Sequence, residues 1–235
     1  MKFRILVGSL LVWGSLPGWA MPGWGALALS GGRSFCAFSP SLNRSEKIEE
    51  SASFQEKKGD RKEDAEQLAR ALDYFASEKF HECLVLLQPL NRRYKLNPRY
   101  RAYLAVCLYY EWEYAEAIRL FDEVLPQLQG VAPHELSLYY WMDAESYFAL
   151  QQYDRALPLY EKMLPVCWEN EKPDAYYRMG FCHLFAAEAS GASNVERKKA
   201  KECFELSLEG YLKYRNTPNE KARIAQIRHM IGGLK

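Results

Sequence analysis

The sequence lacks the residue patterns on which most catalytic and metal sites depend. Its four histidines include no pair three or four residues apart, the spacing that places two metal ligands on one helix face. Its six cysteines include no Cys-x-x-Cys pair, and no glycine-rich phosphate loop occurs. Neighbouring carboxylates such as Asp122 and Glu123 point apart on a helix, whereas acid–base catalysis needs converging groups. We therefore predict a protein that is not an enzyme, with no catalytic residues, no metal and no cofactor.

An excess of charge is also missing. The 31 basic and 30 acidic residues leave a formal net charge of +1, so the chain has no electrostatic reason to bind nucleic acid. The hydrophobic fraction of 49% indicates a globular chain, and 235 residues suffice for one core or a short array of repeats. The aromatic fraction of 14% is high, so the placement of the rings matters for function.

No charged residue occurs from Ile5 to Ser30, although Lys2 and Arg4 precede this apolar stretch. This order of charge, apolar run and small residues is typical of a secretory signal peptide, which we place at residues 1–26, with cleavage after Ala20 or Ala26. The alternative is an uncleaved membrane anchor over residues 5–29, which would be the only membrane contact. Either alternative predicts an exported protein of the periplasm or cell envelope.

A polar segment follows, and we interpret residues 27–64 as a flexible linker because Ser, Gly, Lys and Glu cannot bury enough apolar surface to order it. The folded domain is then predicted over residues 65–235. Within it, Cys83, Cys107, Cys182 and Cys203 fall in apolar helical patterns at wide spacing, which favours buried free thiols. A structural disulfide stays open as an alternative.

The folded region repeats itself. The stretch YAEAIRLFDEVLP begins at Tyr114, and the similar YDRALPLYEKMLP begins at Tyr153. A related phrase begins at Phe80, so the three phrases are spaced by 34 and 39 residues. The apolar periodicity is helical throughout, and a period of 34 residues built from two helices is the signature of the tetratricopeptide repeat.

The chain resembles that family position by position. Each repeat pairs a small residue on its first helix with another twelve residues later, and a large apolar residue stands four places further on. The pairs are Ala71 with Cys83, Ala105 with Ala117, and Ala144 with Ala156, and the large residues are Leu87, Phe121 and Tyr160. Prolines at 98, 133 and 173 suit the first turns of helices. The resemblance implies an all-α, right-handed solenoid of helix-turn-helix repeats.

A fourth repeat is degenerate, because its small residues Gly180 and Ala200 are twenty apart. We expect the extra residues to lengthen the turn around residues 189–195. Thr217-Pro218 and Gly232 then bound a helix that caps the last repeat. His183 occupies a position where the family packs a tyrosine, so we expect it to be partly buried and hydrogen-bonded.

In such a stack the first helices line a concave face, and the resemblance implies that a partner protein or peptide binds there. The candidate partner-binding residues on this face are Tyr103, Tyr109, Tyr110, Trp141, Met142, Glu145, Tyr177, Arg178 and Phe181, with Val106, Phe148 and Phe185 at further positions. Aromatic residues and arginine dominate binding hot spots. Two alternatives stay open, namely that the rings pack between helices and that the groove binds a glycan.

Overall fold

The structure is a computed structural model that describes residues 46–189 and 194–234. The helices in order are α1 (Glu46–Ala76), α2 (Phe80–Tyr94), α3 (Pro98–Tyr110), α4 (Tyr114–Val124), α5 (Pro133–Ala149), α6 (Tyr153–Met163), α7 (Lys172–Ala189), α8 (Asn194–Tyr214) and α9 (Lys221–Gly233). Short 3-10 turns occur at Leu125–Gln127 and Pro218–Glu220. None of the described residues lies in a β-strand.

Contacts divide the chain into two units, Met1–Lys47 and Ile48–Lys235. The structure describes only the last two residues of the first unit, so the predicted signal peptide and the first part of the predicted linker lie outside the described residues. No helix among the described residues is both long enough and apolar enough to cross a membrane.

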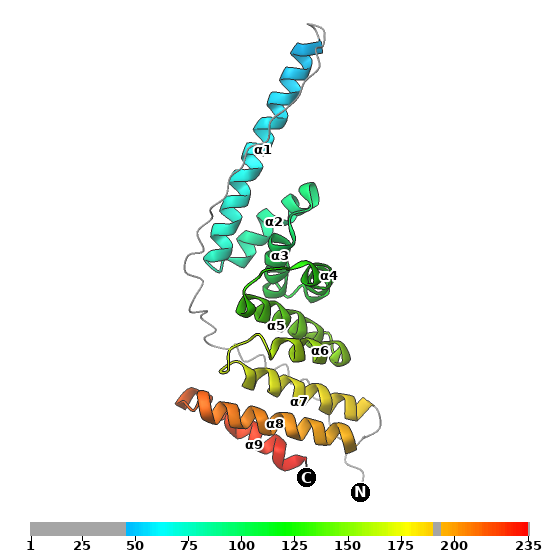
Figure 1. Cartoon of the computed structure of the whole chain (residues 1–235), viewed down its shortest axis with the longest axis vertical. Coiled ribbons are helices and arrows are strands. Elements are labelled where there is room, and N and C mark those ends of the chain that lie inside the picture. Colours follow the sequence, from blue (N-terminus) through cyan, green and yellow to red (C-terminus); the bar gives the residue numbers. More distant parts are fainter. Residues whose placement is uncertain (1–45, 190–193, 235) are drawn as a thin grey trace. The chain divides into compact units, whose positions relative to one another are not determined.

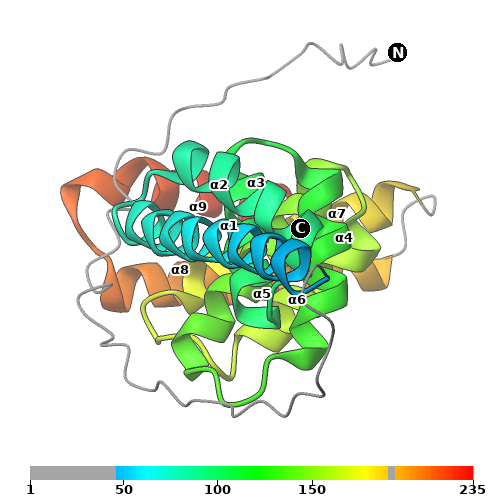
Figure 2. The ribbon, with the colours of Figure 1, turned by 90° about the horizontal axis from the view of Figure 1, so that it is seen from above.

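The second unit is a stack of helix pairs. Helices α3 and α4, α5 and α6, and α7 and α8 pack as antiparallel hairpins, and each pair packs on the next in chain order (Figure 1). In the view along the stack, helices α2 to α9 overlie one another (Figure 2). The fold is therefore the all-α, tetratricopeptide-like solenoid that the period predicted, and α9 covers α8 as the expected final helix.

Small residues allow the two helices of each hairpin to pack closely. Ala105 and Ala117 are both completely buried, and so are Ala144 and Ala156. The first pair, Ala71 and Cys83, is buried to the same degree. Because a larger side chain at these positions would push two helix backbones apart, this burial confirms the register that the twelve-residue spacing predicted.

Three helices start where the prolines of the sequence predicted. Helix α3 begins at Pro98, and the side chain of Asn97 caps it by accepting a hydrogen bond of 3.0 Å from the N–H of Tyr100. Helix α5 likewise begins at Pro133, and α7 begins one residue before Pro173. Proline fits these places because its missing N–H would have no partner in the first turn.

The second half of the predicted linker is part of helix α1, which begins at Glu46. Glutamate and lysine are good helix formers, and Lys62 lies 3.9 Å from Glu66, one turn further along the helix. Asp64 joins this helix to α2: its buried carboxylate accepts hydrogen bonds from Arg93, at 2.5 Å, and from the hydroxyl of Tyr94. Residues 46–64 are thus helical, and the anchored part begins near Asp64.

The fourth hairpin is longer than the second and the third. Helix α7 has 18 residues and α8 has 21, compared with 13 in α3 and 11 in α4. Extra residues therefore extend both helices, whereas the sequence alone placed them in the turn, of which residues 190–193 lie outside the described residues. Gly180 is required here, because a Cβ added to it would lie 2.7 Å from the fully buried ring of Phe204. His183 is hydrogen-bonded to Glu196 at 2.7 Å, as predicted, and it is buried, whereas the sequence predicted partial burial.

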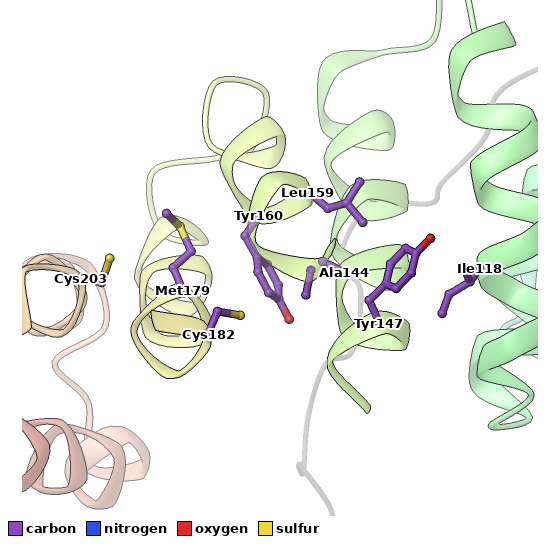
Figure 3. Close-up of a cluster of buried hydrophobic side chains, with 9 residues drawn as sticks. Ile118, Ala144, Tyr147, Leu159, Tyr160, Met179, Cys182 and Cys203 are labelled. Atoms are coloured by element: carbon purple, nitrogen blue, oxygen red, sulfur yellow. The ribbon is translucent and has the colours of Figure 1, made fainter. Parts of the chain in front are cut away.

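The middle of the stack has a continuous core. Figure 3 shows Ile118 of α4, Tyr147 of α5 and Tyr160 of α6 in line with Met179 of α7 and Cys203 of α8. All of these side chains are buried. Each helix pair therefore completes the core of its neighbour, as expected for a solenoid in which stability comes from adjacent repeats.

Candidate functional site

Three equivalent pairs of aromatic rings bracket the turns within the hairpins. In each pair a ring near the end of the first helix meets a ring at the start of the second helix, five residues later. The pairs are Phe75 with Phe80, Tyr109 with Tyr114, and Phe148 with Tyr153, with ring centroids 5.9, 5.9 and 5.1 Å apart. The repeated sequence phrase therefore begins with an aromatic residue because that ring closes its own hairpin.

The same rings also join neighbouring repeats. Phe80 stacks on Tyr110 of α3 with 3.9 Å between centroids, and Tyr153 stacks on Phe185 of α7 with 4.5 Å. Such offset and edge contacts add to the free energy gained from burial alone. We call these eight rings the aromatic ladder, and it has two parts. Phe75, Phe80, Tyr109, Tyr110 and Tyr114 connect the first hairpin to the second, and Phe148, Tyr153 and Phe185 connect the third to the fourth.

An ion pair joins α5 and α7, the first helices of the third and fourth hairpins. Arg178 of α7 donates a hydrogen bond of 2.6 Å to Glu145 of α5, and its guanidinium lies 4.7 Å from the centroid of Phe148. The other oxygen of Glu145 accepts a hydrogen bond of 2.5 Å from the hydroxyl of Tyr160. Side chains of Glu145 and Arg178 are 11% and 29% exposed, so a molecule bound to this face would reach the arginine first.

Electrostatics keep the guanidinium of Arg178 charged. Burial is the largest single influence on Arg178 and opposes its positive charge, but the charge and hydrogen bond of Glu145, together with nearby Tyr160 and Tyr109, raise the pKa of the guanidinium. Burial, followed by the negative charge of Glu145, raises the pKa of the Tyr109 hydroxyl. The face therefore presents a neutralised ion pair surrounded by un-ionised phenols.

The structure places the nine predicted partner-binding residues in two classes. Met142 and Tyr177 are 4% and 5% exposed, so they belong to the packing and cannot contact a partner as the helices stand. The other seven are half-buried, namely Tyr103, Tyr109, Tyr110, Trp141, Glu145, Arg178 and Phe181.

Several of these seven also pack against a neighbouring helix. Tyr103 stacks on Phe75 at 4.3 Å, and Trp141 meets the ring of Tyr160 edge-on at 5.5 Å. The same rings therefore both pack against a neighbouring helix and stay partly exposed.

Four members of the aromatic ladder were not among the predicted site residues, namely Phe75, Phe80, Tyr114 and Tyr153. Tyr114 and Tyr153 were recognised only as the first residues of the repeated phrase. A signal was present in the sequence, since each follows another aromatic residue by five positions. Its meaning depends on the turn geometry, which brings the end of one helix beside the start of the next.

Elsewhere, Asp143 of α5 is an unusual buried acid. It is completely buried, and neither of its carboxyl oxygens has a hydrogen-bond partner among the described residues. Burial, together with the negative charge of nearby Asp122, raises its pKa to about 8, so the carboxyl is neutral at neutral pH.

The described cysteines form neither a disulfide nor a group of metal ligands. Within residues 46–189 and 194–234, every cysteine is free and no three potential metal ligands gather. Cys83 and Cys107 are fully buried, and their mutual hydrogen bond, with burial, raises the pKa of the Cys107 thiol. These thiols behave as small apolar residues, as predicted.

Comparisons with known proteins add little to this picture. Neither a protein-family model nor a curated protein sequence matches the chain. Among solved structures, MamA from Desulfovibrio magneticus is similar at 15% identity and a TM-score of 0.48, over 73% of this chain and 92% of that one. A thermophilic TPR protein of Thermus thermophilus is similar at 14% identity and a TM-score of 0.39, over 73% and 98% of the two chains. Since both TM-scores are below 0.5, the assignment of the fold rests on the chain's own helices and spacing.

Proposed function

We propose that this protein is a non-catalytic adaptor of the cell envelope that binds a peptide or a partner protein on the face formed by α3, α5 and α7. The observation that supports this function most is the half-exposure of aromatic side chains on three successive first helices. A stack that needed these rings only for packing could bury them fully, as it buries Tyr139, Tyr160 and Tyr211.

The chemistry of the face favours a protein partner. Its rings are large, held by ring contacts, and lose few rotatable bonds on binding, which are the properties of interface hot spots. Glu145 already accepts hydrogen bonds from Arg178 and Tyr160, which leaves few polar groups for the hydroxyls of a sugar. The envelope location in this proposal is supported by the signal-like sequence of residues 1–26 alone.

Trp141 offers the sharpest test, because it is the largest half-buried ring of this face. The parent protein and Trp141→Ala would be crosslinked in their native host, purified and examined for partners. Trp168→Ala is the matched control, since Trp168 is 51% exposed on the turn between α6 and α7. Circular dichroism melts of all three proteins show whether each variant still folds.

We expect a protein that copurifies with the parent and with Trp168→Ala and is lost in a folded Trp141→Ala. Retention of that protein by folded Trp141→Ala would contradict the proposed face. A polysaccharide recovered in place of a protein would replace the adaptor function with glycan binding at the same rings. If Trp141→Ala proves unfolded, Tyr110→Ser tests the same face from α3 with the same readout.

A further inference from the structure

Two cysteines meet at the first interface between neighbouring repeats. Cys83 lies on α2 and Cys107 lies on α3, and these two helices pack against each other. Both side chains are completely buried, and their thiols are hydrogen-bonded to one another. The two sulfur atoms are therefore neighbours in space, although the residues are 24 positions apart along the chain.

The repeat register confines this pairing to the first interface. Cys83 takes the place of the small residue on a second helix, and Cys107 stands two places after the small residue of the next first helix. The equivalent buried pairs at the second and third interfaces are Ala117 with Ser146 and Ala156 with Cys182. Because the fold accepts pairs with one sulfur atom or none at these positions, packing alone does not require two thiols here.

The first interface also holds the end of the stack. Helices α1 and α2 form the first hairpin, and no helix pair precedes them among the described residues (Figure 1). An end repeat of a solenoid has one neighbouring repeat in place of two, so it opens more readily than a repeat inside the stack. A covalent bond from α2 to α3 would oppose this opening.

We propose that Cys83 and Cys107 form a disulfide when the chain meets a disulfide oxidant, and that this bond fastens the first hairpin to the second. The oxidant is the disulfide of a thiol oxidoreductase or of a small thiol such as glutathione. One protein thiolate attacks that disulfide, which forms a mixed disulfide and releases one thiol. The second protein thiolate then attacks the protein sulfur of the mixed disulfide and releases the second thiol. Two protein S–H groups thus become one S–S bond, and their protons and two electrons leave with the two released thiols.

Burial determines when this exchange takes place. The hydrogen bond to Cys83, together with burial, raises the pKa of the Cys107 thiol, so the closed stack holds no reactive thiolate there. Exchange therefore requires the first hairpin to open, either during folding or by fraying of the stack. An exported protein meets the oxidising surroundings in which such a bond persists. The inference itself rests on the cysteine pair and does not depend on the proposed partner-binding face.

The test refolds the full chain from urea in a glutathione buffer that is either mostly oxidised or mostly reduced. A tryptic map without reduction identifies the linked peptides, because Arg92 and Arg93 let trypsin separate the two cysteines. Thermal unfolding of the same samples is followed by circular dichroism. Two variants, Cys83→Ala and Cys107→Ser, install the residues of the second interface. Cys167→Ser is the control, because it removes a half-buried thiol after α6 and leaves the pair unchanged.

We expect oxidised parent and oxidised Cys167→Ser to contain peptides joined through Cys83 and Cys107. Both proteins should unfold about 5 to 10 °C above their reduced forms, because the bond restricts the unfolded chain. Cys83→Ala and Cys107→Ser should lack this difference between the two buffers, and either variant suffices if the other does not fold.

The peptide map alone can overturn the inference, whether or not the variants fold. Oxidised parent without the joined peptides would do so, and so would a map in which another pairing predominates. A joined pair that leaves the unfolding temperature unchanged would overturn the role of the bond in fastening the first hairpin. A difference between the buffers that persists in a folded Cys83→Ala would do the same.

Discussion

Replacing Asp143 by asparagine should remove a large pH dependence from the stability of this protein. The parent carboxyl binds its proton in the folded protein up to a pKa of about 8, whereas in the unfolded chain it titrates near 3.8. Between these two values the folded state holds one proton more than the unfolded state. Stability therefore falls as pH rises through this window, by about 1.4 kcal/mol per pH unit.

The effect can be estimated for an accessible range. From pH 5 to pH 8 the titration of Asp143 should lower the free energy of unfolding by about 3 to 4 kcal/mol. The amide that replaces the carboxyl in Asp143→Asn cannot ionise, so this variant should lack the loss and become the more stable protein as pH rises. An amide is close in shape to a neutral carboxyl, so the two proteins should differ far less at pH 5.

Urea unfolding followed by circular dichroism at pH 5, 6, 7 and 8 measures the difference between the two proteins. Other titrating groups cancel in that difference, including His81, whose pKa is raised by its hydrogen bond to Glu111 and whose stabilisation is also lost as pH rises. Asp154→Asn, an exposed substitution on α6, is the control and should retain the parent's pH dependence. A constant difference between the parent and Asp143→Asn from pH 5 to pH 8 would refute the reasoning, since it would mean that Asp143 is already ionised in the folded protein.

Three further predictions concern packing and the thiols. Gly180→Ala should destabilise the fourth hairpin by about 1 to 2 kcal/mol, because the added methyl meets the immobile ring of Phe204; a thermal melt at or above the parent's would contradict this contact. Ala117→Leu should cost about 1 to 3 kcal/mol by separating α3 from α4, and an unchanged urea midpoint would count against the repeat register. Burial raises the pKa of Cys182 to about 12 and that of Cys203 to about 11, so both should resist Ellman's reagent at pH 8 until urea unfolds the chain; rapid labelling in the folded protein would show that they are accessible.

Much of the fold could be predicted from the sequence, because in a helical hairpin the spacing of two residues along the chain determines whether they are in contact. Ala105 and Ala117 meet because a separation of twelve residues leads through one hairpin to the facing position on the second helix. Pro98 and Pro133 are the first residues of α3 and α5, and they mark helix starts however the hairpins pack. The sequence also implied which faces of the first helices would carry rings. The sequence did not distinguish buried Met142 from its half-buried neighbour Trp141. It also did not distinguish buried Tyr177 from its half-buried neighbour Arg178, because adjacent residues lie within one turn of the same helix.

By itself, then, the sequence determined the repeat period, the register of the small residues and the all-α class, since each follows from contacts within one hairpin. Only the tertiary structure decided the features that depend on how hairpins stack. It joined Glu145 to Arg178 across 33 positions of the chain, and it placed Asp143 out of reach of water and of any described hydrogen-bond partner. It also showed Trp112 as an exposed ring where the neighbouring turns carry polar residues. Burial and exposure are properties of every helix packed around a residue, and no local pattern records them.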